Sequence, residues 1–522
     1  MTKSRINEIR PKKERRKYML KHLTSVETGI YFLCFFVYVY CCYSWQLYKM
    51  QDLSLFFFSY NDLRLVDHSL SGYGAYIARF FLQFCYYPLC GSLLFTLLNV
   101  GIQQAWHRIF GTSRFVLLAY LPSSLLLIYC SRLRYEIFYT IPPERPMEIV
   151  LLLFALSWMA VLSVGMFRKT NKNDMLFELD RSGVLKHLSL YFLLLLFTFS
   201  AVDHDRNART VFKMQYLLDR HDWQGMVKTA ERVDKPNRLV AAYRTLALVN
   251  TGELSSKLFD FTYDYPELQL ISRRGETMGE GVVYAPEVNF HAGLVYASLR
   301  NLTERATVYG VSPYTLKWMV KCALLNENWP VAEKYLTLLQ KTLFYASMAQ
   351  EYRKKIGDMK RVVADKELLS AYDLVPIDDR FEQDLRKPLF IGYYTVAANG
   401  KSKRSLDLSM SACLYVKELD AFALRARALT GEKNIPKHFQ EGILTYSLLK
   451  ATDFDRYFSI MPGMKRRTET LLSRIAELKQ TPDKGKEALA KEYGDHYLYY
   501  YYFGNRSTKS AETQSVSNSG IN

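Results

Sequence analysis

The sequence predicts an all-α protein with two parts: a transmembrane helical bundle of about five spans and, behind it, an α-solenoid of stacked helix pairs. Two observations lead to this prediction. Long apolar runs are concentrated in residues 1–202, whereas polar turns break up residues 203–522 about every dozen residues. The second part also repeats one short polar turn between helical segments.

Five apolar segments approach the roughly 20 residues that a helix needs to cross a bilayer. Pro88 and Pro122 fall inside the second and third segments, where we expect them to kink the helices. The first segment has no small-residue cleavage site, so we expect it to remain as an anchor. The predicted spans are residues 29–45, 76–100, 115–130, 149–166 and 185–202, within a transmembrane domain of residues 26–202.

Basic residues predict the orientation in the membrane. The net charge is +18, and the densest basic cluster is the tail of residues 1–25. Because cytoplasmic flanks are rich in Lys and Arg, we expect a cytoplasmic N-terminus in the inner (cytoplasmic) membrane and contact with membrane lipids rather than nucleic acid. Five spans then place the part from residue 203 in the periplasm of a Gram-negative cell, whereas four or six spans would place it in the cytoplasm.

Residues 203–360 are predicted to form helical repeats. The turn Asp219-Arg220-His221-Asp222-Trp223 is followed by similar turns at residues 250–254 and 325–329, with Ala at the helix contacts and a Pro236-Asn237 break. This pattern resembles the tetratricopeptide repeat family, whose period is near 34 residues. The resemblance implies that neighbouring helix pairs stack and share one continuous core.

The rest of the chain is predicted to be helical over residues 361–504 and disordered over the polar tail, residues 505–522. The segment from Ile435 to Glu441, Ile-Pro-Lys-His-Phe-Gln-Glu, places a proline at a helix start. Near the end, Tyr497 and Tyr499–Tyr502 are expected to pack against preceding helices. Spans, repeats, this motif and the tyrosine-rich end together resemble an uncharacterised family of Gram-negative bacterial multi-span membrane proteins, which implies architecture but no activity.

Signatures of catalysis are missing from the sequence. It has no G-x-x-x-x-G-K-[ST], G-x-G-x-x-G, G-x-S-x-G, H-E-x-x-H or C-x-x-C motif, so we expect no cofactor and no metal site. Asp203-His204-Asp205, directly after the last span, is interpreted as a polar membrane exit. No charged residue lies near the middle of a predicted span, which argues against an active transporter.

We therefore expect a membrane-anchored interaction or scaffold protein of the cell envelope, with a protein or peptide partner on the solenoid. The aromatic candidates for contact are also expected to pack in the core. The candidate contact residues are Trp223, Tyr243, Trp318, Trp329, Arg273 and Arg274.

One enzyme alternative stays open. Multi-span glycosyltransferases that use lipid-linked sugars keep an acidic residue in the first external loop, and here that loop contains Asp62 and Asp67. Such a residue could act as general base on an acceptor. The small number of predicted spans speaks against this class.

Overall fold

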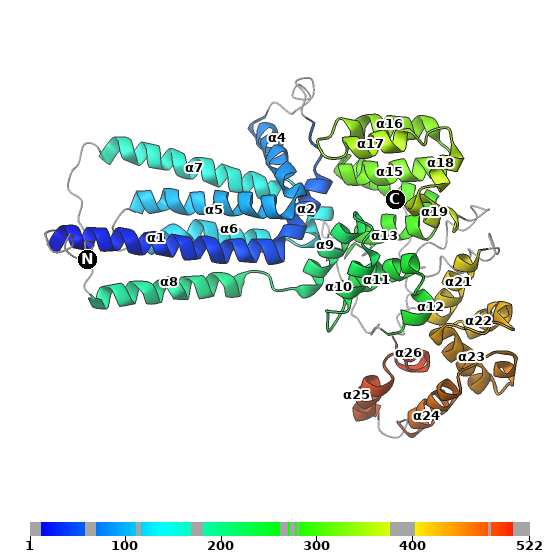
Figure 1. The fold of residues 1–522 in the computed structure, drawn as a ribbon. Coiled ribbons are helices and arrows are strands. Elements are labelled where there is room, and N and C mark those ends of the chain that lie inside the picture. Colours follow the sequence, from blue (N-terminus) through cyan, green and yellow to red (C-terminus); the bar gives the residue numbers. More distant parts are fainter. Residues whose placement is uncertain are drawn as a thin grey trace, which may run out of the picture. The chain divides into compact units, whose positions relative to one another are not determined.

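The computed structural model describes residues 12–57, 69–110, 116–168, 181–260, 270–271, 277–278, 281–375, 402–478 and 482–504. The chain divides into two compact units. Unit 1 comprises Met1–Arg209 with Lys341–Phe344, and unit 2 comprises Thr210–Gln340 with Tyr345–Asn522. Apart from a two-residue antiparallel pair, β1 (Leu270–Ile271) and β2 (Thr277–Met278), the described elements are helical (Figure 1). The predicted fold class, all-α, is confirmed.

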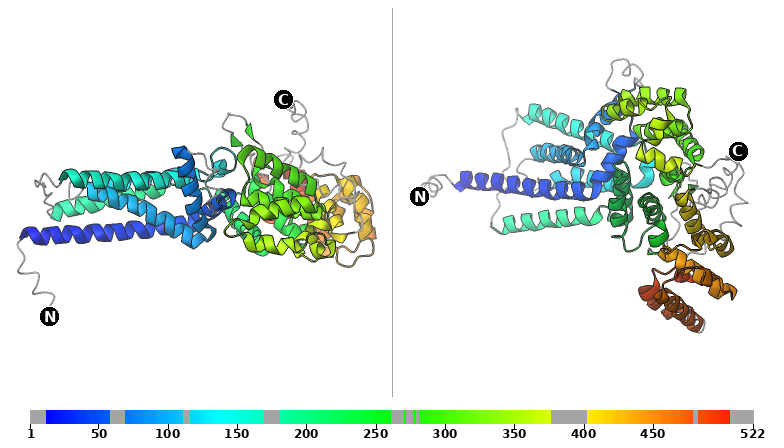
Figure 2. Two further views of the ribbon diagram at one scale, coloured as in Figure 1. Left: turned by 90° about the horizontal axis from the view of Figure 1, so that it is seen from above. Right: turned by 45° about the vertical axis from the view of Figure 1, so that its right-hand side comes forward.

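Unit 1 is a bundle of long helices that lie side by side in Figures 1 and 2. Its first helix is nearly continuous, because α1 (Lys12–Tyr38) passes through a π-helical turn, η2 (Val39–Tyr43), into α2 (Ser44–Leu53). The central helix is α5 (Pro88–Phe110), which packs against α1, α2, α6 and α7. The other elements are α4 (Leu70–Leu82), η3 (Gln83–Tyr86), η4 (Val116–Tyr120), α6 (Leu121–Arg132), η5 (Tyr135–Phe138), α7 (Arg145–Arg168) and α8 (Arg181–Ala201).

Prolines begin helices in unit 1 rather than bend them. The predicted span 76–100 is two helices, since α4 ends at Leu82 and α5 begins at Pro88. Between them Tyr87 is extended (φ −100°, ψ 112°), the conformation that a following proline favours. Pro122 lies in the first turn of α6, where its missing N–H breaks no helical hydrogen bond. The predicted kinks inside continuous helices are therefore wrong.

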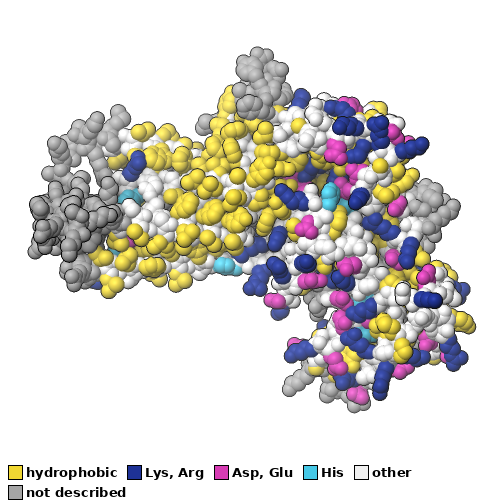
Figure 3. Space-filling view, in the orientation of Figure 1, with side chains coloured by type: hydrophobic (Ala, Val, Ile, Leu, Met, Phe, Trp, Pro, Cys, Tyr) yellow, Lys and Arg dark blue, Asp and Glu magenta, His cyan; other side chains and the backbone are white. Residues whose placement is uncertain are grey.

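Three helical stretches of the described chain are long and apolar enough to cross a membrane: Leu23–Leu53, Arg145–Val164 and Val184–Ala201. Each presents large apolar side chains outward, with Leu33 60%, Leu162 67% and Leu196 68% exposed. Hydrophobic side chains cover much of unit 1 on the face that Figure 3 shows. So extensive an apolar surface suits lipid and would be unfavourable in water.

The polar segment after α8 binds the end of α6. Arg134 forms ion pairs with Asp203 and with Asp205, whose Oδ2 lies 2.9 Å from Nη1 of the arginine. The backbone N–H of Asp203 donates to Ser131 Oγ at 3.2 Å. Through Asp203 and Asp205, this segment therefore connects the end of α8 to the end of α6 and the residues that follow it.

Unit 2 consists of short helices joined mostly by tight turns, and most consecutive helices, such as α13 to α17, pack on each other. Its helices are α9 (Arg206–Leu218, whose first residues belong to unit 1), α10 (Trp223–Ala230), α11 (Arg238–Thr251), α12 (Leu254–Lys257), α13 (Gly281–His291), α14 (Val295–Tyr309), α15 (Pro313–Leu325), α16 (Trp329–Gln340), α17 (Ala346–Arg353), α18 (Met359–Val363), α19 (Lys366–Tyr372), α21 (Lys403–Tyr415), α22 (Leu419–Ala426), η7 (Arg427–Leu429), α23 (Lys437–Lys450), η8 (Phe454–Tyr457), α24 (Pro462–Leu478), α25 (Pro482–Tyr493) and α26 (Tyr497–Phe503).

One turn geometry recurs through unit 2. A residue with positive φ stands two positions before α10, α12, α14, α16, α18 and α22. These residues are His221, Gly252, Gly293, Glu327, Gly357 and Lys417. At every one of these junctions except that of Gly357, the next N–H donates to a carbonyl five residues back, for example Asp222 to Leu217 and Asn328 to Ala323. This closure ends a helix in the left-handed conformation, so unit 2 is built from helical hairpins with a common turn.

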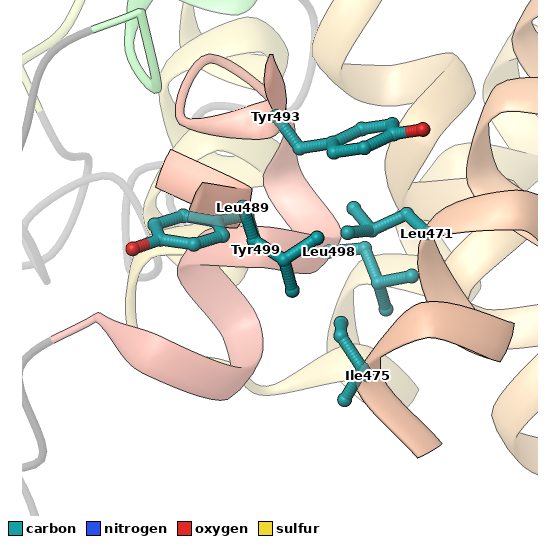
Figure 4. Close-up of a cluster of buried hydrophobic side chains, with 6 residues drawn as sticks. All are labelled: Leu471, Ile475, Leu489, Tyr493, Leu498 and Tyr499. Carbon is teal, nitrogen blue, oxygen red and sulfur yellow. The ribbon is translucent and has the colours of Figure 1, made fainter. Parts of the chain in front are cut away.

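The C-terminal helices share a small core of their own. Figure 4 shows Leu471 and Ile475 of α24, Leu489 and Tyr493 of α25, and Leu498 and Tyr499 of α26 packed together. Tyr497 and Tyr500 are also buried. The predicted packing role is confirmed for these tyrosines of the C-terminal segment.

Candidate functional site

A buried carboxylate in unit 2 gathers polar side chains from helices far apart in the sequence. We call Glu367, Lys321, His221, His291 and Tyr352 the Glu367 cluster. The Nζ atom of Lys321 lies 2.7 Å from Glu367 Oε1, and the Tyr352 hydroxyl donates to Oε2 at 3.4 Å. The Nε2 atoms of His221 and His291 lie 3.7 and 3.9 Å from the carboxylate. The cluster therefore joins the α9–α10 turn to α13, α15, α17 and α19.

Local backbone structure positions Glu367 and the nearby Asp365, which caps its helix. Glu367 lies in the first turn of α19, where the helix dipole favours negative charge. The cap of this helix is Asp365, whose Oδ1 accepts from the N–H groups of Glu367 at 3.0 Å and Leu368 at 3.2 Å. Lys355 holds Asp365 in turn, with 3.0 Å between Nζ and Oδ2. The start of α19 is thus fixed by its own cap before Glu367 meets its partners.

A hydrogen-bond network determines the tautomer of His291. Arg404 Nη2, which can only donate, lies 3.2 Å from Asn250 Oδ1, so the amide nitrogen of Asn250 must face the other way. That nitrogen lies 3.5 Å from His291 Nδ1, which therefore accepts. In the neutral imidazole the proton then sits on Nε2, facing Glu367.

Burial and charge have opposite effects on the ionisation of these groups. Burial raises the pKa of Glu367, but Lys321 above all, then the two histidines, lower that pKa below its usual value. Burial lowers the pKa of His291 to about 3, with Glu367 opposing the shift. At neutral pH the cluster thus consists of an ionised carboxylate, a lysine and an uncharged buried imidazole.

Aromatic rings surround His291 on several sides. Its ring centroid lies 5.2 Å from Trp223, 5.4 Å from Phe290 and 5.7 Å from Trp318. Lys321 Nζ lies 4.1 Å from the centroid of the Trp318 ring, a cation–π contact. Two predicted contact residues, Trp223 and Trp318, therefore meet here around a histidine that the sequence did not single out.

The other predicted residues do not join this cluster. Tyr243 is buried, accepts from Gln215 Nε2 at 2.7 Å and donates to the Val283 carbonyl at 3.3 Å. Trp329 begins α16 and is half-buried. Because Tyr243 and Trp318 are buried, they support the surface of unit 2 rather than form it. Arg273, Arg274, Asp62 and Asp67 lie outside the described residues.

The motif from Ile435 to Glu441 builds a second buried polar site, which we call the Glu441 cluster. His438 Nδ1 donates to Glu441 Oε2 at 2.9 Å, because its Nε2 accepts from the Phe259 N–H at 3.2 Å. The same carboxylate oxygen accepts from the Tyr497 N–H at 2.9 Å. Burial raises the pKa of Glu441, but the bond from His438 and the nearby His496 lower that pKa below its usual value. The motif thus joins the end of α12, helix α23 and the start of α26.

The chemistry of both clusters is that of an ionised carboxylate surrounded by polar partners, although Glu441 Oε1 itself accepts no hydrogen bond. Among the described residues, no group of three or more His, Cys, Asp or Glu side chains could hold a metal ion. Of the Glu367 cluster and its aromatic neighbours, His221 is 47% exposed and Trp223 is half-buried. The Glu367 cluster therefore gives a rigid base to a surface formed in part by His221 and Trp223.

We expect unit 2 to lose stability as the pH falls below about 6.5, the ordinary pKa of histidine. The unfolded chain takes up a proton at His291 there, whereas the folded chain resists until the pKa of about 3. The loss amounts to ~1.4 kcal/mol for each pH unit in this window, or about 2 kcal/mol at pH 5. Urea unfolding of the full chain, followed by tryptophan fluorescence at pH 7.5 and 5, measures it.

His291→Gln should reduce this pH dependence, since glutamine does not titrate, whereas His496, whose pKa is also lowered by burial, remains in the variant. His204→Gln is the control, because His204 is an exposed histidine outside unit 2, and this variant should keep the wild-type dependence. An equal fall in stability in wild type and His291→Gln would contradict the assignment.

Comparison with known proteins places the chain in a family. No curated protein and no solved structure matches this chain. The model of a family described as Family of unknown function (DUF6057) matches residues 20–143 and 138–504, which together cover both units almost completely. The chain therefore belongs to the DUF6057 family.

Proposed function

We propose that this protein is a membrane-anchored docking protein, in which unit 1 is the anchor and unit 2 binds a protein or peptide partner. The observation that carries the proposal is the recurring hairpin turn of unit 2, from His221 to Lys417. Helical hairpins that repeat one turn stack side by side, as in tetratricopeptide repeats, and stacking produces an extended surface suited to chain segments.

The proposed anchor crosses the membrane five times. Besides the three long apolar stretches, α5 has 23 residues, about 35 Å of helix, and exposes Leu89, Leu93 and Leu97 along one side. The shorter η4–α6 segment exposes Leu118 and Leu125. Outward-facing apolar residues therefore favour contact with lipid for all five crossing segments: the three long stretches, α5 and η4–α6. With the basic tail in the cytoplasm, unit 2 would lie in the periplasm of a Gram-negative cell.

A topology map tests this arrangement. Compartment-sensitive reporters fused after Val202 and after Asn505 should both report the periplasm. If both report the cytoplasm, the number of crossings is even and the docking surface faces the cytoplasm.

The end of α14 is the proposed contact region. Val308, Tyr309 and Val311 are exposed there although they are apolar or aromatic, and such residues are enriched at contact surfaces. A photo-crosslinking amino acid at Tyr309, in the full chain in cells, should give a discrete protein adduct. The same amino acid at Glu351, an exposed charged position on α17, is the control. The same adducts at both positions, or none at Tyr309, would overturn docking at this surface.

A further inference from the structure

The interior of unit 1 contains polar side chains with no protein partner. Gln103 of α5 is 0% exposed, and neither its Oε1 nor its Nε2 makes a hydrogen bond. One turn further along, the buried Nε2 of His107 also lacks a partner. Burying an amide without hydrogen bonds is unfavourable, so a partner outside the protein chain is expected.

A histidine–carboxylate pair lies beside His107, one turn from Gln103 on α5. His187 of α8 places Nε2 at 3.1 Å from Oε1 of Glu27 on α1, and both side chains are mostly buried. His107 is close enough to interact electrostatically with both of them. The titratable groups that face this part of the bundle are Glu27, His107, His187, Tyr31, Tyr120 and Tyr191.

The tyrosines differ in their hydrogen bonding. Tyr191 donates to the Glu27 carbonyl at 2.6 Å, and Tyr31 donates to Ser123 Oγ at 2.8 Å, since that serine donates to a backbone carbonyl. The Tyr120 hydroxyl faces Thr28 without hydrogen-bond geometry. Tyr120 thus has unused hydrogen-bonding capacity next to the ion pair.

Hydrogen-bonding groups without a protein partner are concentrated in the second half of α5, where Asn99 Oδ1 is the first of them. Ser92, Thr96, Asn99, Gln103 and His107 follow one side of this helix at intervals of three or four residues. The first three donate to backbone carbonyls four residues earlier, those of Pro88, Ser92 and Phe95. Only toward the His107 end of this stripe do both donors and acceptors remain unused.

The unused groups define the chemistry of the ligand. An amide offers both a donor and an acceptor, and an imidazole nitrogen or a phenol can complement either. A hydrocarbon chain satisfies none of them, and a metal cation is repelled by the amide N–H groups. Water, which donates and accepts and typically makes about three hydrogen bonds in buried sites, satisfies all of them.

We propose that unit 1 encloses a water-binding site that joins Gln103, His107 and Tyr120 to the Glu27–His187 ion pair. The site lies near the end of α5, which finishes at Phe110, so its path to the aqueous phase is short. Hydrated ionisable groups inside a membrane bundle are the usual elements of proton paths. Water at this site links His107 and Tyr120 to Glu27 and His187 by hydrogen bonds. The inference does not depend on partner docking.

Radiolytic hydroxyl labelling of the full chain in lipid nanodiscs tests the proposal, because radicals formed from bound water modify adjacent side chains. Tyr120 and His107 should be labelled several-fold faster than Tyr43. Tyr43 is an equally buried tyrosine of the same bundle, but it packs against Phe95 and directs its hydroxyl to the sulfur of Met50.

Gln103→Leu should lower labelling of Tyr120 and His107 several-fold and leave Tyr43 unchanged. Labelling of Tyr120 and His107 at the rate of Tyr43 in the wild-type protein would overturn the proposal. The wild-type comparison needs no variant to fold, and the topology reporters test the membrane crossings separately.

Discussion

Replacing Gly293 with alanine is expected to destabilise unit 2 by about 3 kcal/mol or more, whereas Gly252→Ala should cost only about 1 kcal/mol. Both glycines occupy the same turn conformation, with φ of +83° and +71°. A Cβ atom at Gly252 would meet nothing within 4 Å, but one at Gly293 would overlap the backbone carbonyl of Leu374. The pair therefore separates the conformational cost of a left-handed residue from the cost of a backbone collision.

The larger loss expected for Gly293→Ala also tests how the helices of the Glu367 cluster pack. Gly293 directly follows the helix of His291, and Leu374 lies just after α19, the helix of Glu367. Their close approach brings the two helices together. Urea midpoints of the full chain measure both variants, and Gly293→Ala should also alter the tryptophan fluorescence of the cluster. Equal losses for the two variants would show that the close contact is not made.

Glu441→Ala is expected to destabilise the C-terminal helices by about 3–5 kcal/mol, because it removes the charged acceptor at the centre of a buried network. Glu441 is 0% exposed, and His438 and the Tyr497 N–H would both lose their partner. Glu441→Gln keeps one acceptor oxygen and should cost less. Exposed Glu469 on α24 is the control, and Glu469→Ala should change stability by about 0.5 kcal/mol or less.

Limited proteolysis of the full chain, read by mass spectrometry, locates this effect. Cleavage in Glu441→Ala should rise between α23 and α26 and stay at the wild-type level near α13–α16. Unchanged protection of the C-terminal helices would mean that their apolar core, seen in Figure 4, holds them without the Glu441 cluster.

Local features of the sequence predicted the elements of this protein well. Apolar runs predicted the long helices of unit 1, and the polar turns near residues 221, 252 and 327 predicted helix junctions of unit 2. The tyrosine-rich end was expected to pack, and Tyr497 and Tyr499 do so. These features are readable because helix periodicity and turn chemistry act over a few neighbouring residues.

Proline effects were harder to predict. Pro88 and Pro122 were expected to kink helices, yet each stands at a helix start. A proline at the first turn and a proline inside a helix differ only in whether the preceding residues continue the helix. The packing of unit 1 decides whether the residues before each proline continue the helix, and the apolar composition of the segment does not show this.

Sequence patterns were enough to predict the all-helical class, the concentration of apolar helices before residue 203 and the recurring turns after it. The packing of the helices in three dimensions brought His291, Lys321 and Glu367 into one cluster, and His107 beside the pair of Glu27 and His187. No spacing in the chain marks these residues, because their partners lie on other helices. A buried charge or amide is recognised by what surrounds it, and helix packing decides those surroundings.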